Sequence, residues 1–180
     1  MKRLLTATVV VLLFSVMFIM GVCVAAGPYS IPTTAKWTGT LYNVGLCTLV
    51  PPGNHILTVN IGEGVSSVMG SAQFVLVSCV DPATFTGAGW GVVTTANGDT
   101  LHLDIPNITV TFSESAPREW SETEIIVGGT GKFENAIGSS FSHGTFTSGT
   151  DPFPFENQES PPLLLAPEGW VGTSEGEITF

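Results

Sequence analysis

The sequence predicts an all-β protein: a single eight-stranded antiparallel β-barrel with almost no helix. Beyond the first 26 residues, no window of about 11 or more residues carries apolar side chains at helical spacing. Short runs that alternate between apolar and polar residues recur instead, separated by Gly, Pro, Asn and Asp. There are eight such runs, and an even number lets the first and last strands of an up-and-down barrel pair. A two-sheet sandwich with a similar number of strands is the alternative.

The predicted strands cover residues 36–42, 55–61, 68–79, 86–96, 99–112, 120–127, 138–148 and 170–180. We expect Gly62–Gly64 to form the turn between the second and third strands. Asn97-Gly98 predicts a two-residue hairpin turn between the fourth and fifth strands, because both turn positions need positive φ. Pairing about that turn would place an apolar face inward, with Thr94, Val92 and Trp90 opposite Leu101, Leu103 and Ile105.

The sequence leaves open whether the barrel interior is filled or hollow. An eight-stranded barrel is just wide enough for side chains to fill it, or for one small ligand to bind inside. If the interior is filled, the candidates for filling it are Trp37, Phe74, Trp90, Phe112 and Phe141. Inward polar residues around a void would instead favour catalysis.

The first residues have the pattern of a cleaved signal peptide. Lys2 and Arg3 precede an apolar run that ends at about Val24, and the small residues Ala25 and Ala26 follow. We therefore expect residues 1–26 to be removed and the protein to be secreted. A retained membrane anchor is the alternative, since about 20 apolar residues can span a bilayer. The remaining chain divides into a leader (27–35) and the barrel domain (36–180), with a Pro-rich insert at 151–169.

Removal of the signal peptide leaves a strongly acidic chain. Its 15 acidic residues are then balanced by only three basic ones, Lys36, Arg118 and Lys132, which gives a formal charge of −12. Nucleic acids and anionic membranes are bound through basic patches, so this charge argues against both. A membrane partner is expected only if the N-terminal segment is retained.

Two cysteines remain after that cleavage, Cys47 and Cys79. An even number of cysteines in an oxidising compartment predicts a disulfide between them. Two buried free thiols are the alternative.

A glycine-rich segment, residues 128–149, separates the sixth and seventh strands. Its opening resembles a phosphate-binding loop, but Phe133 follows Lys132 where such a loop needs Ser or Thr, and no helix follows. We therefore predict a structural turn at one end of the barrel, with Phe133 plugging that end. The residues assigned to this turn are Gly128, Gly129, Gly131, Phe133 and Gly138.

No catalytic, cofactor-binding or metal-binding residues are assigned. The histidines His55, His102 and His143 show no local metal-ligand spacing, and the serines lack a Gly-x-Ser-x-Gly elbow. Glu122 and Glu124 share one face of a predicted strand. A charged solvent-facing surface explains this spacing as well as paired acid chemistry does.

The Pro-rich insert is more apolar than a solvated loop needs to be. We interpret it as a lid or plug over a barrel mouth, or as a contact surface for a partner or a second copy of the chain. The residues expected to make that contact are Phe153, Phe155, Leu163, Leu164 and Leu165.

Several motifs together resemble those of a family. Gly62-x-Gly64, Met69-Gly70, Ala96-Asn97-Gly98-Asp99 and the segment from Gly128 to Gly138 are similar to secreted bacterial proteins of the allene oxide cyclase barrel-like group, which is distantly similar to plant dirigent proteins. The resemblance covers residues 36–180 and implies a calycin-like barrel of eight antiparallel strands. It assigns no functional residue in this chain.

Two functions remain open at this point. The first is a non-enzymatic secreted barrel that binds a small apolar ligand or acts as a structural or interaction module, with a homo-oligomer as one form of that interaction. The second is an enzyme of cyclase or isomerase type that confines an apolar substrate inside the barrel.

Overall fold

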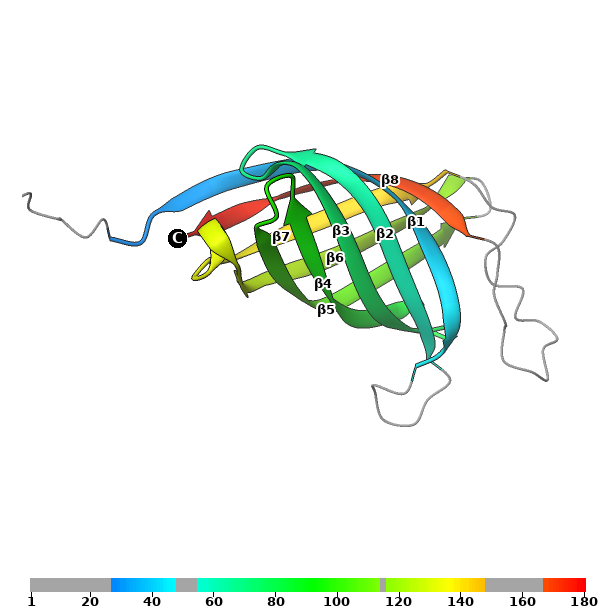
Figure 1. Ribbon diagram of the computed structural model, residues 1–180. Helices are drawn as coiled ribbons and strands as arrows, with labels where there is room; N and C mark the ends of the chain where they lie inside the picture. Colours follow the sequence, from blue (N-terminus) through cyan, green and yellow to red (C-terminus); the bar gives the residue numbers. More distant parts are fainter. Residues whose placement is uncertain (1–26, 48–54, 114–115, 148–166) are drawn as a thin grey trace, which may run out of the picture.

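Eight antiparallel strands close into one barrel in the computed structural model, which describes residues 27–47, 55–113, 116–147 and 167–180 (Figure 1). The predicted fold class is therefore confirmed, and the sandwich alternative is wrong. Within the described part of the chain, the one helical segment is the short 3-10 helix η1, and no helix is long and apolar enough to cross a membrane. The elements are β1 (Ser30–Leu46), β2 (Ile56–Ser66), β3 (Gly70–Asp81), β4 (Thr86–Thr95), β5 (Thr100–Ser113), β6 (Ala116–Gly129), η1 (Gly131–Phe133), β7 (Ile137–Phe146) and β8 (Glu168–Thr179).

Several strands extend beyond their predicted ends. β1 begins at Ser30, inside the segment interpreted as a leader, and its early residues pair with β8, as Thr33 does with Gly176. β8 begins at Glu168, inside the predicted insert. The predicted signal peptide and the proposed contact residues of the insert, Phe153, Phe155 and Leu163–Leu165, lie outside the described residues.

The predicted turn between the second and third strands is wrong. β2 continues through Gly62 and Gly64 to Ser66, and β3 follows after residues 67–69. Gly62 instead pairs with Phe74, and a Cβ atom at Gly62 would lie 2.5 Å from Cζ of that ring. Glycine is needed here to admit an aromatic ring to the barrel interior, not to turn the chain.

The predicted register between β4 and β5 is also wrong, by one residue. Val93 pairs with Leu101, and the Thr95 N–H donates to the Asp99 carbonyl at 2.9 Å, so the loop contains residues 96–98. Of these, only Gly98 has positive φ (91°), which is the geometry of a three-residue hairpin loop. Since a shift of one residue reverses the two faces of a strand, Val93 points inward and Trp90 lies on the outer face, 50 % exposed.

An aromatic layer fills the middle of the barrel. The Trp170 ring lies 4.9 Å from that of Trp120 and 5.5 Å from that of Phe74, and Phe74 meets Trp37 edge-on at 5.5 Å. Glycines on neighbouring strands make room for these rings, because a Cβ atom at Gly39 would lie 2.8 Å from Cζ2 of Trp170. The prediction that Trp37 and Phe74 point inward is confirmed.

Two of the other predicted interior aromatics lie elsewhere. Trp90 and Phe141 are on the outer face, 50 % and 46 % exposed, so their placement in the interior was wrong. The side chain of Phe112 lies outside the described residues.

The segment between β6 and β7 forms a tight turn around η1. Gly128 (φ 124°) and Gly131 (φ 58°) adopt conformations that residues with a Cβ atom rarely reach, and Gly138 also has positive φ. Gly129 precedes the turn as the last residue of β6. Phe133 is fully buried and its ring lies 5.9 Å from that of Phe180. This turn lies at the same end of the barrel as the C-terminal end of β8, which we call the η1 end (Figure 1).

The predicted disulfide between Cys47 and Cys79 is present, so the free-thiol alternative is wrong. The two Cα atoms lie 5.7 Å apart. Cys47 directly follows β1, while Cys79 lies in β3 opposite Leu57 of β2. The bond therefore ties the end of β1 to β3 beside the start of β2, at the end of the barrel opposite η1.

Candidate functional site

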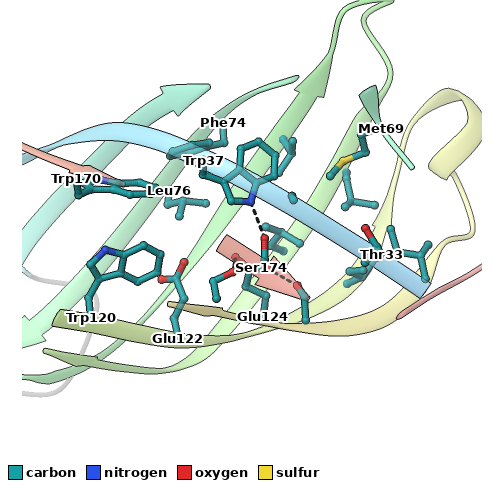
Figure 2. A pocket seen from close by; sticks show the side chains of 18 residues that line it. Thr33, Trp37, Met69, Phe74, Leu76, Trp120, Glu122, Glu124, Trp170 and Ser174 are labelled. Atoms are coloured by element: carbon teal, nitrogen blue, oxygen red, sulfur yellow. Dashed lines mark hydrogen bonds between the residues drawn. The ribbon is translucent and has the colours of Figure 1, made fainter. Parts of the chain in front are cut away.

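A polar strip runs along one side of the barrel interior. On β6, Glu122 and Glu124 pair with Ser142 and Ser140 of β7, and Ser142 in turn pairs with Ser174 of β8. Serine side chains are short, so they leave room for two carboxyl groups inside a narrow barrel. Figure 2 shows Glu122, Glu124 and Ser174 pointing into the same space.

Glu122 and Glu124 are 8 % and 9 % exposed, so the interpretation of these residues as a charged solvent-facing surface is wrong. The alternation of β6 is the signal that could have placed them. Trp120 and Ile126 have the same parity in the strand and are buried, whereas Val127, of the opposite parity, is exposed. Hydrophobic neighbours of the same parity outweigh the general preference of glutamate for the surface.

The carboxyl pair lines a cavity of about 40 Å³, which we call the first chamber. It lies between the aromatic layer and the η1 end, where Thr33 and Met69 line it (Figure 2). Trp37 and Ser174 both line the chamber, and the indole Nε1–H of Trp37 donates to Ser174 Oγ at 2.6 Å. The part of the wall formed by β3, β4 and β5 is apolar and consists of Phe74, Leu76, Val93, Leu101 and Leu103.

The two glutamates have unequal surroundings. Ser142 Oγ–H donates to Glu124 Oε1 at 2.9 Å, and Ser140 Oγ–H donates to Glu124 Oε2. Burial raises the pKa of Glu124, and these serine hydrogen bonds oppose the rise because they stabilise the carboxylate.

Burial also raises the pKa of Glu122, well above its ordinary value. The charge of Glu124 and a hydrogen bond to it raise the pKa of Glu122 further. Glu122 is therefore the proton holder of the pair, and it donates to the more readily ionised Glu124. A neutral carboxylic acid next to a carboxylate, in a chamber with one apolar wall, can donate a hydrogen bond or exchange a proton with a bound molecule.

A second cavity, of about 50 Å³, lies on the other side of the aromatic layer. We call it the second chamber. Leu76, Trp120, Glu122 and Trp170 line both chambers, so these four side chains form the partition. Glu168 lines the second chamber and forms an ion pair with Arg118.

The histidines lie apart from both chambers. His102 and His143 are exposed, and His143 stacks on Phe141 with ring centroids 5.8 Å apart. Neither chamber is lined by a histidine. Across the described ranges, no three His, Cys, Asp or Glu side chains are grouped so that they could hold a metal ion.

Glu122→Gln is expected to make the protein more stable at neutral pH, by about 1 to 3 kcal/mol, the usual cost of burying a poorly compensated polar group. The glutamine amide can still donate to Glu124, and it stays neutral without taking up a proton when the protein folds. The folded-state pKa of Glu122 is raised, so its contribution to stability is full below the unfolded-state pKa of about 4.5 and is lost as pH rises toward the folded-state pKa.

The advantage of Glu122→Gln should therefore be small near pH 4 and grow toward neutral pH. Urea unfolding of both proteins across this range measures the difference. Glu63→Gln, at an exposed position of β2, is the matched control. A glutamine variant that is less stable than the wild type at neutral pH would show that Glu122 is not a buried acid of raised pKa.

No family model, curated protein or solved structure matches this chain. The resemblance to the allene oxide cyclase barrel-like group therefore stays a prediction.

Proposed function

We propose that this is a secreted protein whose barrel binds a small, largely apolar molecule that carries one hydrogen-bond-accepting oxygen. The observation that carries the proposal is the buried Glu122–Glu124 pair facing an apolar wall across the first chamber. A purely structural barrel of this width would fill that space with apolar side chains. The disulfide is compatible with a protein outside the cytoplasm, and the pattern of residues 1–26 supports secretion.

The two sides of the first chamber select different parts of such a ligand. The O–H of protonated Glu122 turns from Glu124 to a carbonyl or ether oxygen of the ligand, while Ser140 and Ser142 continue to donate to Glu124. Leu101, Leu103 and Val93 offer no hydrogen bond and suit carbon atoms. The volume of about 40 Å³ admits a group of a few heavy atoms, so the ligand is small or inserts one end past Met69.

Two experiments test the binding proposal. Native mass spectrometry of protein purified from its source should show a bound species of low mass. In vitro, cyclopentanone should shift the indole N–H resonance of Trp37 saturably in ¹H–¹⁵N spectra, whereas cyclopentane, which lacks the oxygen, should bind more weakly.

Two substitutions of Glu122 by residues of similar size distinguish the effect of its hydrogen-bond donor from the effect of its shape. Glu122→Gln keeps a hydrogen-bond donor and should keep cyclopentanone affinity within about threefold, while Glu122→Met removes the donor and should weaken it by about tenfold, the usual worth of a buried hydrogen bond. Equal affinities of the two variants, or the absence of any saturable shift of Trp37, would reject Glu122 as the recognition group.

The unequal environments of Glu122 and Glu124 favour a second candidate function, a proton-transferring enzyme of cyclase or isomerase type. Paired carboxyl groups whose pKa values are pushed apart serve as acid and base. Glu122 would protonate the substrate oxygen, and Glu124, held by Ser140 and Ser142, would accept a proton from carbon. The family resemblance supports the same class of chemistry.

Exchange of the α-protons of cyclopentanone in ²H₂O distinguishes an enzyme from a binding protein. General acid–base groups contribute about 10²- to 10⁴-fold to such a step. An enzyme would accelerate exchange and lose that acceleration in Glu122→Gln, although that variant still binds. Exchange at the same rate in the wild type and in Glu122→Gln would reject the enzyme and leave binding as the only supported function.

A further inference from the structure

The second chamber contains two buried polar groups that lack partners. Trp120 is 9 % exposed and Glu168 is 3 % exposed. In the described part of the chain, neither Trp120 Nε1–H nor Glu168 Oε2 has a hydrogen-bond partner. Both side chains line the chamber of about 50 Å³. Figure 2 shows the indole nitrogen of Trp120 on the side of its ring that faces away from Glu122.

The neighbouring polar side chains are already engaged. Trp170 Nε1–H donates to Asn60 Oδ1 at 3.1 Å, and the hydroxyl groups of Thr58 and Ser78 bond to each other at 2.6 Å. Glu168 Oε1 is ion-paired with Arg118. Glu122 also lines the chamber, and its O–H is engaged with Glu124. The chamber therefore presents one free donor, Trp120 Nε1–H, and one free acceptor, Glu168 Oε2, to whatever enters it.

We propose that the second chamber is a binding site for the hydroxyl group of an alcohol. The alcohol oxygen accepts from Trp120 Nε1–H, and its O–H donates to Glu168 Oε2. A buried donor or acceptor that lacks a partner is unfavourable, and a hydroxyl group satisfies both at once. The apolar remainder of the wall, formed by Leu41, Val80, Ile108, Val110 and Phe146, receives the carbon chain.

Other ligand classes fit this pair of groups less well. A ketone or ether accepts a hydrogen bond but leaves Glu168 Oε2 unpaired. An ammonium group donates but leaves Trp120 Nε1–H unpaired. Water has the hydrogen bonds of an alcohol without its carbon chain, so an alcohol gains about fourfold in affinity for each methylene group that it buries.

The isomers 1-pentanol and butyl methyl ether test the proposal, because they differ in the hydroxyl donor and have the same atoms. Each is titrated into ¹⁵N-labelled protein while the indole N–H resonances are followed. We expect 1-pentanol to shift the Trp120 resonance saturably and to bind about tenfold more tightly than the ether. 1-Butanol should bind about fourfold more weakly than 1-pentanol.

Two matched substitutions locate the site. Trp120→Phe keeps an aromatic ring but removes the donor, and should weaken 1-pentanol binding, followed at the Trp170 resonance, by at least about fivefold. Trp90→Phe makes the same change on the outer face and should leave the affinity unchanged.

Equal affinity for the two isomers, no saturable shift, or normal binding by Trp120→Phe would overturn the proposal. If Trp120→Phe does not fold, the isomer comparison on the wild type still decides. Binding in the first chamber is measured separately, through the Trp37 resonance with cyclopentanone. Either proposed site can therefore be rejected without the other.

Discussion

Trp170→Ala is expected to lower the free energy of unfolding by about 3 to 5 kcal/mol, the range for removal of a buried aromatic side chain. Trp170 lies at the centre of the aromatic layer, where it contacts Trp120 and Phe74 and donates to Asn60 at 3.1 Å. Gly39 lies beneath the ring and has no side chain to fill the space that the substitution creates. The loss should therefore fall in the upper part of the range.

Trp90→Ala provides the matched control for this substitution, because it removes the same side chain from the outer face, where it is 50 % exposed. Its effect should stay below about 1 kcal/mol. Urea unfolding followed by circular dichroism measures both losses. Equal losses would contradict the placement of the two tryptophans. Trp170 is part of the partition between the chambers, so its removal should also open a passage between them.

Removal of the disulfide has the second large expected effect. Replacement of both Cys47 and Cys79 by alanine should lower the free energy of unfolding by about 3 to 4 kcal/mol. The bond closes a loop with a sequence separation of 32 and restricts the unfolded chain accordingly. The unfolding midpoint in urea measures the loss.

The wild type unfolded in the presence of a reductant is the control, because it loses the bond and keeps both side-chain volumes. It should lose nearly as much stability as the alanine variant. A reduced protein as stable as the oxidised one would show that the bond does not contribute to stability.

The number of strands, their order and the closure of the barrel follow from local sequence patterns. Alternating runs bounded by turn residues are local signals, and closure follows from an even number of up-and-down strands. The tight turn at Gly128–Gly138 is equally local, since glycine is required where φ is positive.

Registers, and the space available on the inward face of β6, depend on partners that are distant in the sequence. Gly62 has the composition of a turn, yet it admits the ring of Phe74 from the next strand. Glu122 and Glu124 have the composition of a surface, yet Ser140 and Ser142 make space for them on β7. The role of Gly62 cannot be predicted from β2 alone. The alternation of β6 could have placed Glu122 and Glu124 on the inward face, but the space that admits two carboxyl groups there comes from β7.

The pairing of β1 with β8 also determines how this chain folds. Ser30 lies beside Thr179, at a sequence separation of 149, and the pairing continues to Leu41 and Glu168. Contacts this distant in sequence form late, because much chain entropy is lost before they stabilise anything. We expect folding on the order of milliseconds to seconds, with closure as the last event. Until residues 168–179 have been synthesised, β1 keeps an open edge that other chains can pair with.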